Sequence, residues 1–154
     1  MGKAANSSIS LKQSHVTDNF WNKYVHLVKD VIIPYQWDIL NDKLEDVETS
    51  HCIENFKIAA GEKEGEFQGA VFQDTDVAKW LEAVGFVLNY ERDEKLEELA
   101  DETIELIGRA QQPDGYLNTY FTIKEPDGRW SNLMEGHELY TAGHMICLLY
   151  TSPS

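Results

Sequence analysis

The chain has 154 residues, 42% hydrophobic and 26% charged, which is the size and balance of one ordinary globular domain. Its 27 acidic and 13 basic residues give a formal net charge of −14, which argues against a nucleic acid or an anionic membrane as partner. Residues 1–10 lack the apolar run of a signal peptide, and no segment approaches the roughly 20 apolar residues of a membrane span, so we expect a cytoplasmic protein.

A first helix is predicted to begin after Thr17 or Asp18, either of which can cap it, and to continue through Val31. Apolar residues recur along it at steps of three and four positions, which is the spacing of one helix face. They are Phe20, Trp21, Tyr24, Leu27, Val28 and Val31. Pro34 should kink this helix, which can resume through residues 35–40.

An acidic loop is predicted over residues 41–50, followed by a second, shorter helix over 50–60 that Gly61 caps at its C-terminus. The clearest helix follows, with Asp74 or Thr75 as its N-cap. Its apolar face extends over three turns. That face consists of Val77, Trp80, Leu81, Val84, Val87 and Leu88.

Asp93 precedes another amphipathic helix, which we expect to reach residue 110 with an acidic, solvated outer face. The helical period is then lost over residues 111–135. A long loop or a small β-ribbon is predicted there, because residues 116–123 are followed by an Asp-Gly turn at 127–128. A last helix should begin near Gly136.

Helices that alternate with short connections on one side and long polar connections on the other are typical of stacked helical hairpins. The sequence therefore predicts an all-α fold. In a barrel built from such hairpins the long loops gather at one end, and a polar pocket at that end is the expected site.

The two cysteines, Cys52 and Cys147, are far apart and belong to no Cys-x-x-Cys pair, so we expect two free thiols. The pair His137-Glu138 resembles the start of a zinc-protease motif, but the second histidine would have to stand where Thr141 is. That class is therefore excluded. His144 lies two helical turns after His137 and on the same face.

Two groups of polar residues are candidate ligand contacts. His137 begins a helix after a long loop and can exchange hydrogen bonds with a hydroxyl, with an acidic neighbour fixing its tautomer. Gln73 and Asp74 precede Trp80 at the start of the clearest helix, and Asp114 precedes Tyr116 in a turn. The alternative for each is structural, since an aspartate can cap a helix or close a turn and Trp80 lies on the apolar stripe.

Several blocks of sequence occur together between residues 31 and 146. They are 31–38 (Val-Ile-Ile-Pro-Tyr-Gln-Trp-Asp), 50–51 (Ser-His), 55–61 (Asn-Phe-Lys-Ile-Ala-Ala-Gly), 67–69 (Phe-Gln-Gly), 71–77 (Val-Phe-Gln-Asp-Thr-Asp-Val), 79–82 (Lys-Trp-Leu-Glu), 110–117 (Ala-Gln-Gln-Pro-Asp-Gly-Tyr-Leu), 136–140 (Gly-His-Glu-Leu-Tyr) and 143–144 (Gly-His). In this order and spacing they resemble the bacterial β-L-arabinofuranosidases of glycoside hydrolase family 127 and their relatives.

The resemblance implies that residues 1–146 are the N-terminal part of an (α/α)6 barrel. It implies a retaining glycosidase that releases terminal L-arabinofuranosyl units from plant-type glycans, with an arabinofuranosyl oligosaccharide as the partner. The family's zinc ligands and catalytic residues lie later than this chain reaches, so we expect no catalytic residue, metal ligand or cofactor here and no activity from this chain alone. Residues 147–154 depart from the family and are predicted to be a non-native tail.

Within the resemblance, His137 is similar to a residue that binds the terminal sugar. The predicted substrate-binding set is His137, Gln73, Asp74, Asp114, Tyr116 and Glu138. Two alternatives stay open from the sequence. One is another (α/α)6 barrel sugar enzyme, such as an unsaturated uronyl hydrolase or an epimerase. The other is a non-catalytic helical-repeat module that binds a protein.

Overall fold

The structure is a computed structural model that describes residues 14–151. Every regular element within that range is helical, which confirms the predicted all-α class. The predicted β-ribbon is wrong, because the short helix α6 (Thr119–Ile123) and the 3-10 turn η3 (Pro126–Gly128) occupy this part of the chain. Asn118 explains the difference, since its side chain accepts a hydrogen bond from the Phe121 backbone N–H and caps α6. None of the helices described is long and apolar enough to cross a membrane.

The first helix continues past Pro34 through a change of helical type. Asp18 caps α1 (Asn19–Leu27), as predicted, and α1 passes into the π-helical segment η2 (Val28–Ile32) and then into α2 (Ile33–Leu40). The wider π turn immediately before Pro34 accommodates a residue that has no N–H to donate and whose ring crowds the preceding turn. The sequence predicted a kink at Pro34, and the structure has a π-helical segment in the turn before this residue.

The remaining helices are α3 (Cys52–Ala59), α4 (Asp74–Tyr90), α5 (Glu94–Ala110) and α7 (Glu138–Thr151). Gly61 follows α3 with a φ of +73°, the left-handed conformation expected of a C-terminal glycine.

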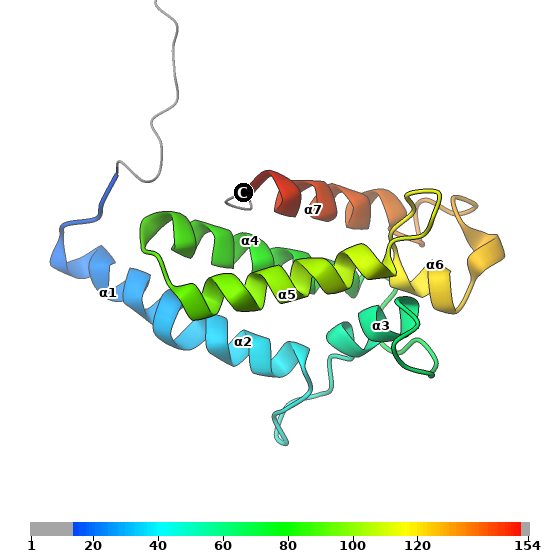
Figure 1. The fold of residues 1–154 in the computed structure, drawn as a ribbon, viewed down its shortest axis with the longest axis horizontal. Helices are drawn as coiled ribbons and strands as arrows, with labels where there is room; N and C mark the ends of the chain where they lie inside the picture. Colours follow the sequence, from blue (N-terminus) through cyan, green and yellow to red (C-terminus); the bar gives the residue numbers. More distant parts are fainter. Residues whose placement is uncertain (1–13, 152–154) are drawn as a thin grey trace, which may run out of the picture.

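The helices alternate in direction, as Figure 1 shows. α4 and α7 run the same way and lie side by side, while α1–α2 and α5 run the opposite way. Only residues 91–93 link α4 to α5, at one end of the bundle, whereas the connections 41–51, 60–73 and 111–137 lie at the other end. The predicted gathering of long loops at one end is confirmed.

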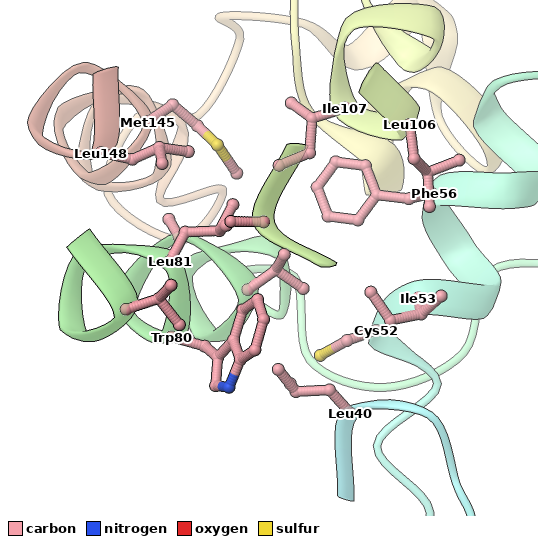
Figure 2. Packing of buried hydrophobic residues seen from close by; sticks show 14 of the residues in the cluster. Leu40, Cys52, Ile53, Phe56, Trp80, Leu81, Leu106, Ile107, Met145 and Leu148 are labelled. Atoms are coloured by element: carbon pink, nitrogen blue, oxygen red, sulfur yellow. The ribbon is translucent and has the colours of Figure 1, made fainter. Parts of the chain in front are cut away.

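The core lies between α4 and the helices packed around it. Figure 2 shows Trp80 and Leu81 of α4 facing side chains from other helices, among them Phe56 of α3 and Ile107 of α5. Trp80 is 2% exposed, and its indole N–H donates a hydrogen bond of 3.1 Å to the Ile33 carbonyl. Trp80 is therefore a core residue, and its ring is not an exposed face on which a sugar can stack.

The two predicted aspartate caps have different outcomes. Asp93 caps α5, because its Oδ1 accepts hydrogen bonds of 3.2 Å from the backbone N–H groups of Lys95 and Leu96. Asp74 does not cap α4, and neither does Thr75, because Gln73 stands at the cap position in helical conformation with no side-chain cap. The Asp74 carboxylate is instead buried against a distant segment.

The Asp93 cap gives a first prediction. Asp93→Ala should lower the free energy of unfolding by about 1 kcal/mol, because two N–H groups of the first turn lose their acceptor. Asp93→Asn keeps an acceptor oxygen at the same position and should retain most of that stability. Urea titrations of the wild type and both variants would measure this, and equal midpoints for all three would contradict the cap's contribution.

Candidate functional site

A pocket of about 590 Å³ with both polar and apolar lining residues lies where α2, the connection 41–51 and the start of α4 meet. The end of α2, the connection 41–51 and the first turns of α4 form its walls. Its lining residues are Gln36, Ile39, Leu40, Glu48, Thr49, Ser50, Gln73, Asp76, Lys79, Trp80 and Ala83. The polar part consists of amides, hydroxyls, carboxylates and an ammonium group, so the pocket offers both donors and acceptors.

The polar side chains at the start of α4 form a series that hydrogen bonds and an ion pair connect. The Gln73 amide donates hydrogen bonds of 3.2 Å to Asp76 Oδ2 and 3.4 Å to Cys52 Sγ. The Lys79 ammonium donates to Thr75 Oγ1 at 3.1 Å and lies 3.5 Å from Asp76 Oδ1. Because Lys79 and Asp76 are both nearly half exposed, this series presents groups to the pocket and is only partly occupied by protein partners.

His137 lies next to this series, in an aromatic cluster. Its ring centroid is 5.3 Å from that of Phe72 and 6.2 Å from that of Tyr140, and the Lys79 ammonium lies 5.5 Å from the Tyr140 ring. His144 contacts the other side of this cluster, with its ring 4.7 Å from that of Tyr140. The structure therefore brings two predicted site residues, His137 and Gln73, to one region through Phe72 and Lys79.

Backbone strain is concentrated at the same end. The non-glycine residues with positive φ among those described are Asp42, His51, Trp130 and His137, with values from 50° to 61°. All of them lie in the long connections. Such conformations cost about 1 kcal/mol or more each and cluster at functional sites.

Asp74 is not among the residues that line the pocket. Its side chain is 3% exposed, and its two oxygens accept hydrogen bonds from the Thr119 N–H at 2.7 Å and the Thr119 hydroxyl at 2.5 Å. Burial raises the pKa of Asp74 from 3.8 to about 6, although the hydrogen bonds from Thr119 oppose the shift. This contact joins the start of α4 to α6.

Glu138 is also buried, at 2% exposure. One carboxylate oxygen accepts a hydrogen bond from the Tyr116 hydroxyl, and the other accepts one of 2.7 Å from the Trp130 N–H. Burial and the bond to Glu138 raise the pKa of Tyr116 far above its ordinary value, so the phenol stays protonated. Glu138 therefore links two loop segments to the start of α7.

Asp114 is exposed and completes this link. One oxygen accepts a hydrogen bond of 3.0 Å from the Tyr116 N–H, closing the predicted turn, and the other pairs with Arg129 at 3.2 Å. The Arg129 guanidinium lies 4.1 Å from the centre of the Tyr116 ring. The turn containing Asp114 is thus fixed to the segment that carries Arg129 and Trp130.

Cys52 and Cys147 are not joined by a disulfide, in agreement with the prediction. Burial raises the pKa of the Cys52 thiol to about 11, so it is neutral at physiological pH. A hydrogen bond to Glu82 raises the pKa of Cys147 above its ordinary value.

Sequence reasoning did not select Phe72, Lys79, Arg129, Trp130 or Tyr140 as residues of this region. The spacing of Asp76 and Lys79, three apart on one helix, is a usable signal for an ion pair. Arg129 and Trp130 carry no such signal, because their partners are at least eight residues away and are set by the tertiary fold.

Comparison with known proteins identifies the family of this chain. Residues 13–151 match the family model described as the GH127 catalytic domain of β-L-arabinofuranosidase. A curated relative, the non-reducing end β-L-arabinofuranosidase of Bifidobacterium longum subsp. longum, is 40% identical over an alignment of 147 positions that covers 85% of this chain. This chain spans 22% of the length of that relative.

Solved structures agree with the sequence match. The crystal structure of a GH127 β-L-arabinofuranosidase from Geobacillus stearothermophilus T6 is 61% identical, with a TM-score of 0.88 over 89% of this chain and 22% of that one. A second GH127 β-arabinofuranosidase is 30% identical, with a TM-score of 0.81 over 93% of this chain and 23% of that one. These enzymes are (α/α)6 barrels, so the helices described here are part of such a barrel. The chain belongs to the GH127 β-L-arabinofuranosidase catalytic-domain family.

Proposed function

We propose that this chain provides part of the sugar-binding end of a retaining β-L-arabinofuranosidase, which releases terminal L-arabinofuranosyl residues from plant-type glycans. Membership of the GH127 family supports the reaction class. The observation that carries the assignment is the position of His137. This residue stands in a strained conformation at the start of α7, in an aromatic cluster that adjoins the polar pocket at the start of α4.

The chemistry of the pocket suits a neutral furanose. Each sugar hydroxyl can donate and accept a hydrogen bond, and Gln73, Asp76 and Lys79 offer an amide, a carboxylate and an ammonium within two turns of α4. The imidazole of His137 adds a group that can donate or accept. The rings of Phe72 and Tyr140 beside it supply apolar surface for the carbon face of a sugar.

The other predicted contacts are assigned different roles in this proposal. Asp74 and Glu138 have both carboxylate oxygens occupied by protein donors, and Asp114 and Tyr116 are engaged with Arg129 and Glu138. We assign these four residues to holding the long connections in place.

The zinc ion that the resemblance implies does not fit the residues described. Among residues 14–151, no group of three or more His, Cys, Asp or Glu side chains is arranged to hold a metal ion. We therefore assign no ligand to this part of the chain and derive no step through the metal.

The proposal predicts the activity of a full-length enzyme that carries this segment. Such an enzyme should release L-arabinose from p-nitrophenyl β-L-arabinofuranoside with retention of configuration, which NMR of the first-formed anomer would show. The 154-residue chain alone should release none, because it spans 22% of the length of its relatives. Turnover of an unsaturated uronyl disaccharide in place of the arabinofuranoside would contradict the proposal.

A further inference from the structure

The start of α7 is held from both sides of His137. On one side, the Gly136 N–H donates a hydrogen bond of 2.8 Å to the Asn132 carbonyl, and a Cβ at Gly136 would lie 2.8 Å from that oxygen and 2.9 Å from the Phe121 ring. On the other side is the buried carboxylate of Glu138. His137 itself has a φ of +50°, so a conformation that is unfavourable for a side-chain-bearing residue is imposed by its neighbours.

Glu138 holds the start of α7 through hydrogen bonds of its side chain. Its carboxylate accepts from the Tyr116 hydroxyl, at the end of the 111–117 turn, and from the Trp130 N–H, in the next part of the connection. Trp130 also has a left-handed backbone, and its ring contacts Tyr116 edge-on at 5.4 Å. The buried carboxylate of Glu138, the residue directly after His137, therefore binds both the 111–117 turn and the segment that contains Trp130.

Two positive electrostatic features lie near the Glu138 carboxylate. Arg129 lies over the Tyr116 ring, and Glu138 is in the first turn of α7, where the helix dipole stabilises a negative charge. Both oxygens of an ionised carboxylate can accept, which is what the two donors require. An amide at this position would have one acceptor oxygen and an NH2 group that can only donate.

We propose that Glu138 is a positioning residue that holds His137 in its sugar-binding geometry by accepting hydrogen bonds from Tyr116 and Trp130. This inference rests on the proposed function, because it takes His137 as the sugar contact. It assigns Glu138 no contact with the sugar, since both of its oxygens are occupied and its side chain is buried.

The test compares variants of a full-length enzyme that carries this segment. Glu138→Gln should lower kcat/KM on p-nitrophenyl β-L-arabinofuranoside about tenfold, and Tyr116→Phe should lower it in the same direction by removing one of the two donors. Glu125→Gln is the matched control. Glu125 also accepts from a tyrosine hydroxyl in this connection, that of Tyr120 at 2.6 Å, but on the exposed surface. It should keep wild-type kinetics.

A double-mutant cycle with His137→Ala separates a positioning role from a direct contact. If Glu138 acts through His137, then adding Glu138→Gln to His137→Ala should cause no further loss of kcat/KM. The two single variants should also divide their losses between KM and kcat in the same way. A general loss of folding would reproduce neither the absence of further loss nor the shared division between KM and kcat. Thermal unfolding of each variant measures such a loss of folding separately.

Several outcomes would overturn the inference. Wild-type kinetics for Glu138→Gln would do so, and so would additive losses in the double variant, which indicate that Glu138 touches the sugar itself. If Glu138→Gln does not fold, Tyr116→Phe carries the same cycle, and wild-type kinetics for that variant overturn the inference. Unchanged kcat/KM for His137→Ala alone has a different meaning: it removes the proposed sugar contact, and the role of Glu138 with it.

Discussion

Replacing His137 by alanine in a full-length enzyme that carries this segment is expected to lower kcat/KM on terminal β-L-arabinofuranosides by about 10- to 100-fold. This loss corresponds to about 1.4 to 2.8 kcal/mol, the range for one hydrogen bond between a protein side chain and a bound substrate group. Steady-state kinetics with p-nitrophenyl β-L-arabinofuranoside would measure it. The prediction follows from the position of His137 between Phe72 and Tyr140, beside the polar groups of α4.

His144 offers a matched control for this experiment. Its ring also packs against Tyr140, with the ring centroids 4.7 Å apart, but we assign it no contact with the sugar. His144→Ala should therefore remove a similar amount of aromatic packing while leaving kcat/KM within about twofold of the wild type. Equal losses in both variants would attribute the effect to Tyr140 packing and would refute a sugar contact by His137.

The buried carboxylate of Asp74 should make the stability of the protein depend on pH. Its pKa in the folded protein is about 6, above the ordinary value of 3.8, so the folded state binds this proton more tightly than the unfolded state does. The stabilisation is complete below pH 3.8 and is lost as the pH rises through about 6. The difference between the two pKa values corresponds to about 3 kcal/mol.

Asp74→Asn should remove this component. An asparagine has the same shape and no charge to desolvate, and its oxygen can still accept from the Thr119 N–H. Urea titrations between pH 4 and pH 7 should therefore show a gap between wild type and variant that changes by up to about 3 kcal/mol over this range. A gap for Asp74→Asn that is constant with pH would contradict the shifted pKa.

Much of the helical framework was predictable because it depends on local patterns. Asp93 caps α5 through bonds to residues two and three positions later, and the apolar stripe of α4 repeats at the helical period. Gly61 ends its helix for an equally local reason, since glycine adopts positive φ without steric cost. The residues that make each of these interactions lie within a few positions of each other in the sequence.

The errors come from interactions between distant residues. Asp74 has the right place and chemistry for a cap, but its carboxylate binds Thr119, 45 positions later. The same contact helps to explain why residues 119–123 form a helix where a long loop or a small β-ribbon was predicted. The π-helical segment before Pro34 was missed because a proline signals that a regular helix is disturbed, without showing how.

The candidate site was predictable only in part. His137 and Gln73 were found from their polar surroundings and from the resemblance, and the structure places them near each other through Phe72. The hydrogen bond between Tyr116 and Glu138 could not be predicted, because a buried pair joined across a long connection has the same sequence signature as two exposed ligand contacts.

The unequal connections of this fold have a consequence for how the protein can change. The link between α4 and α5, residues 91–93, is short and leaves little room for variation. The connections 60–73 and 111–137 are long and lie at the other end of the bundle. Lengthening a long loop costs little additional entropy, so insertions there are tolerated while the helices keep their packing. Natural divergence or protein engineering can thus change the pocket at this end by altering these segments alone, while the helical scaffold is kept.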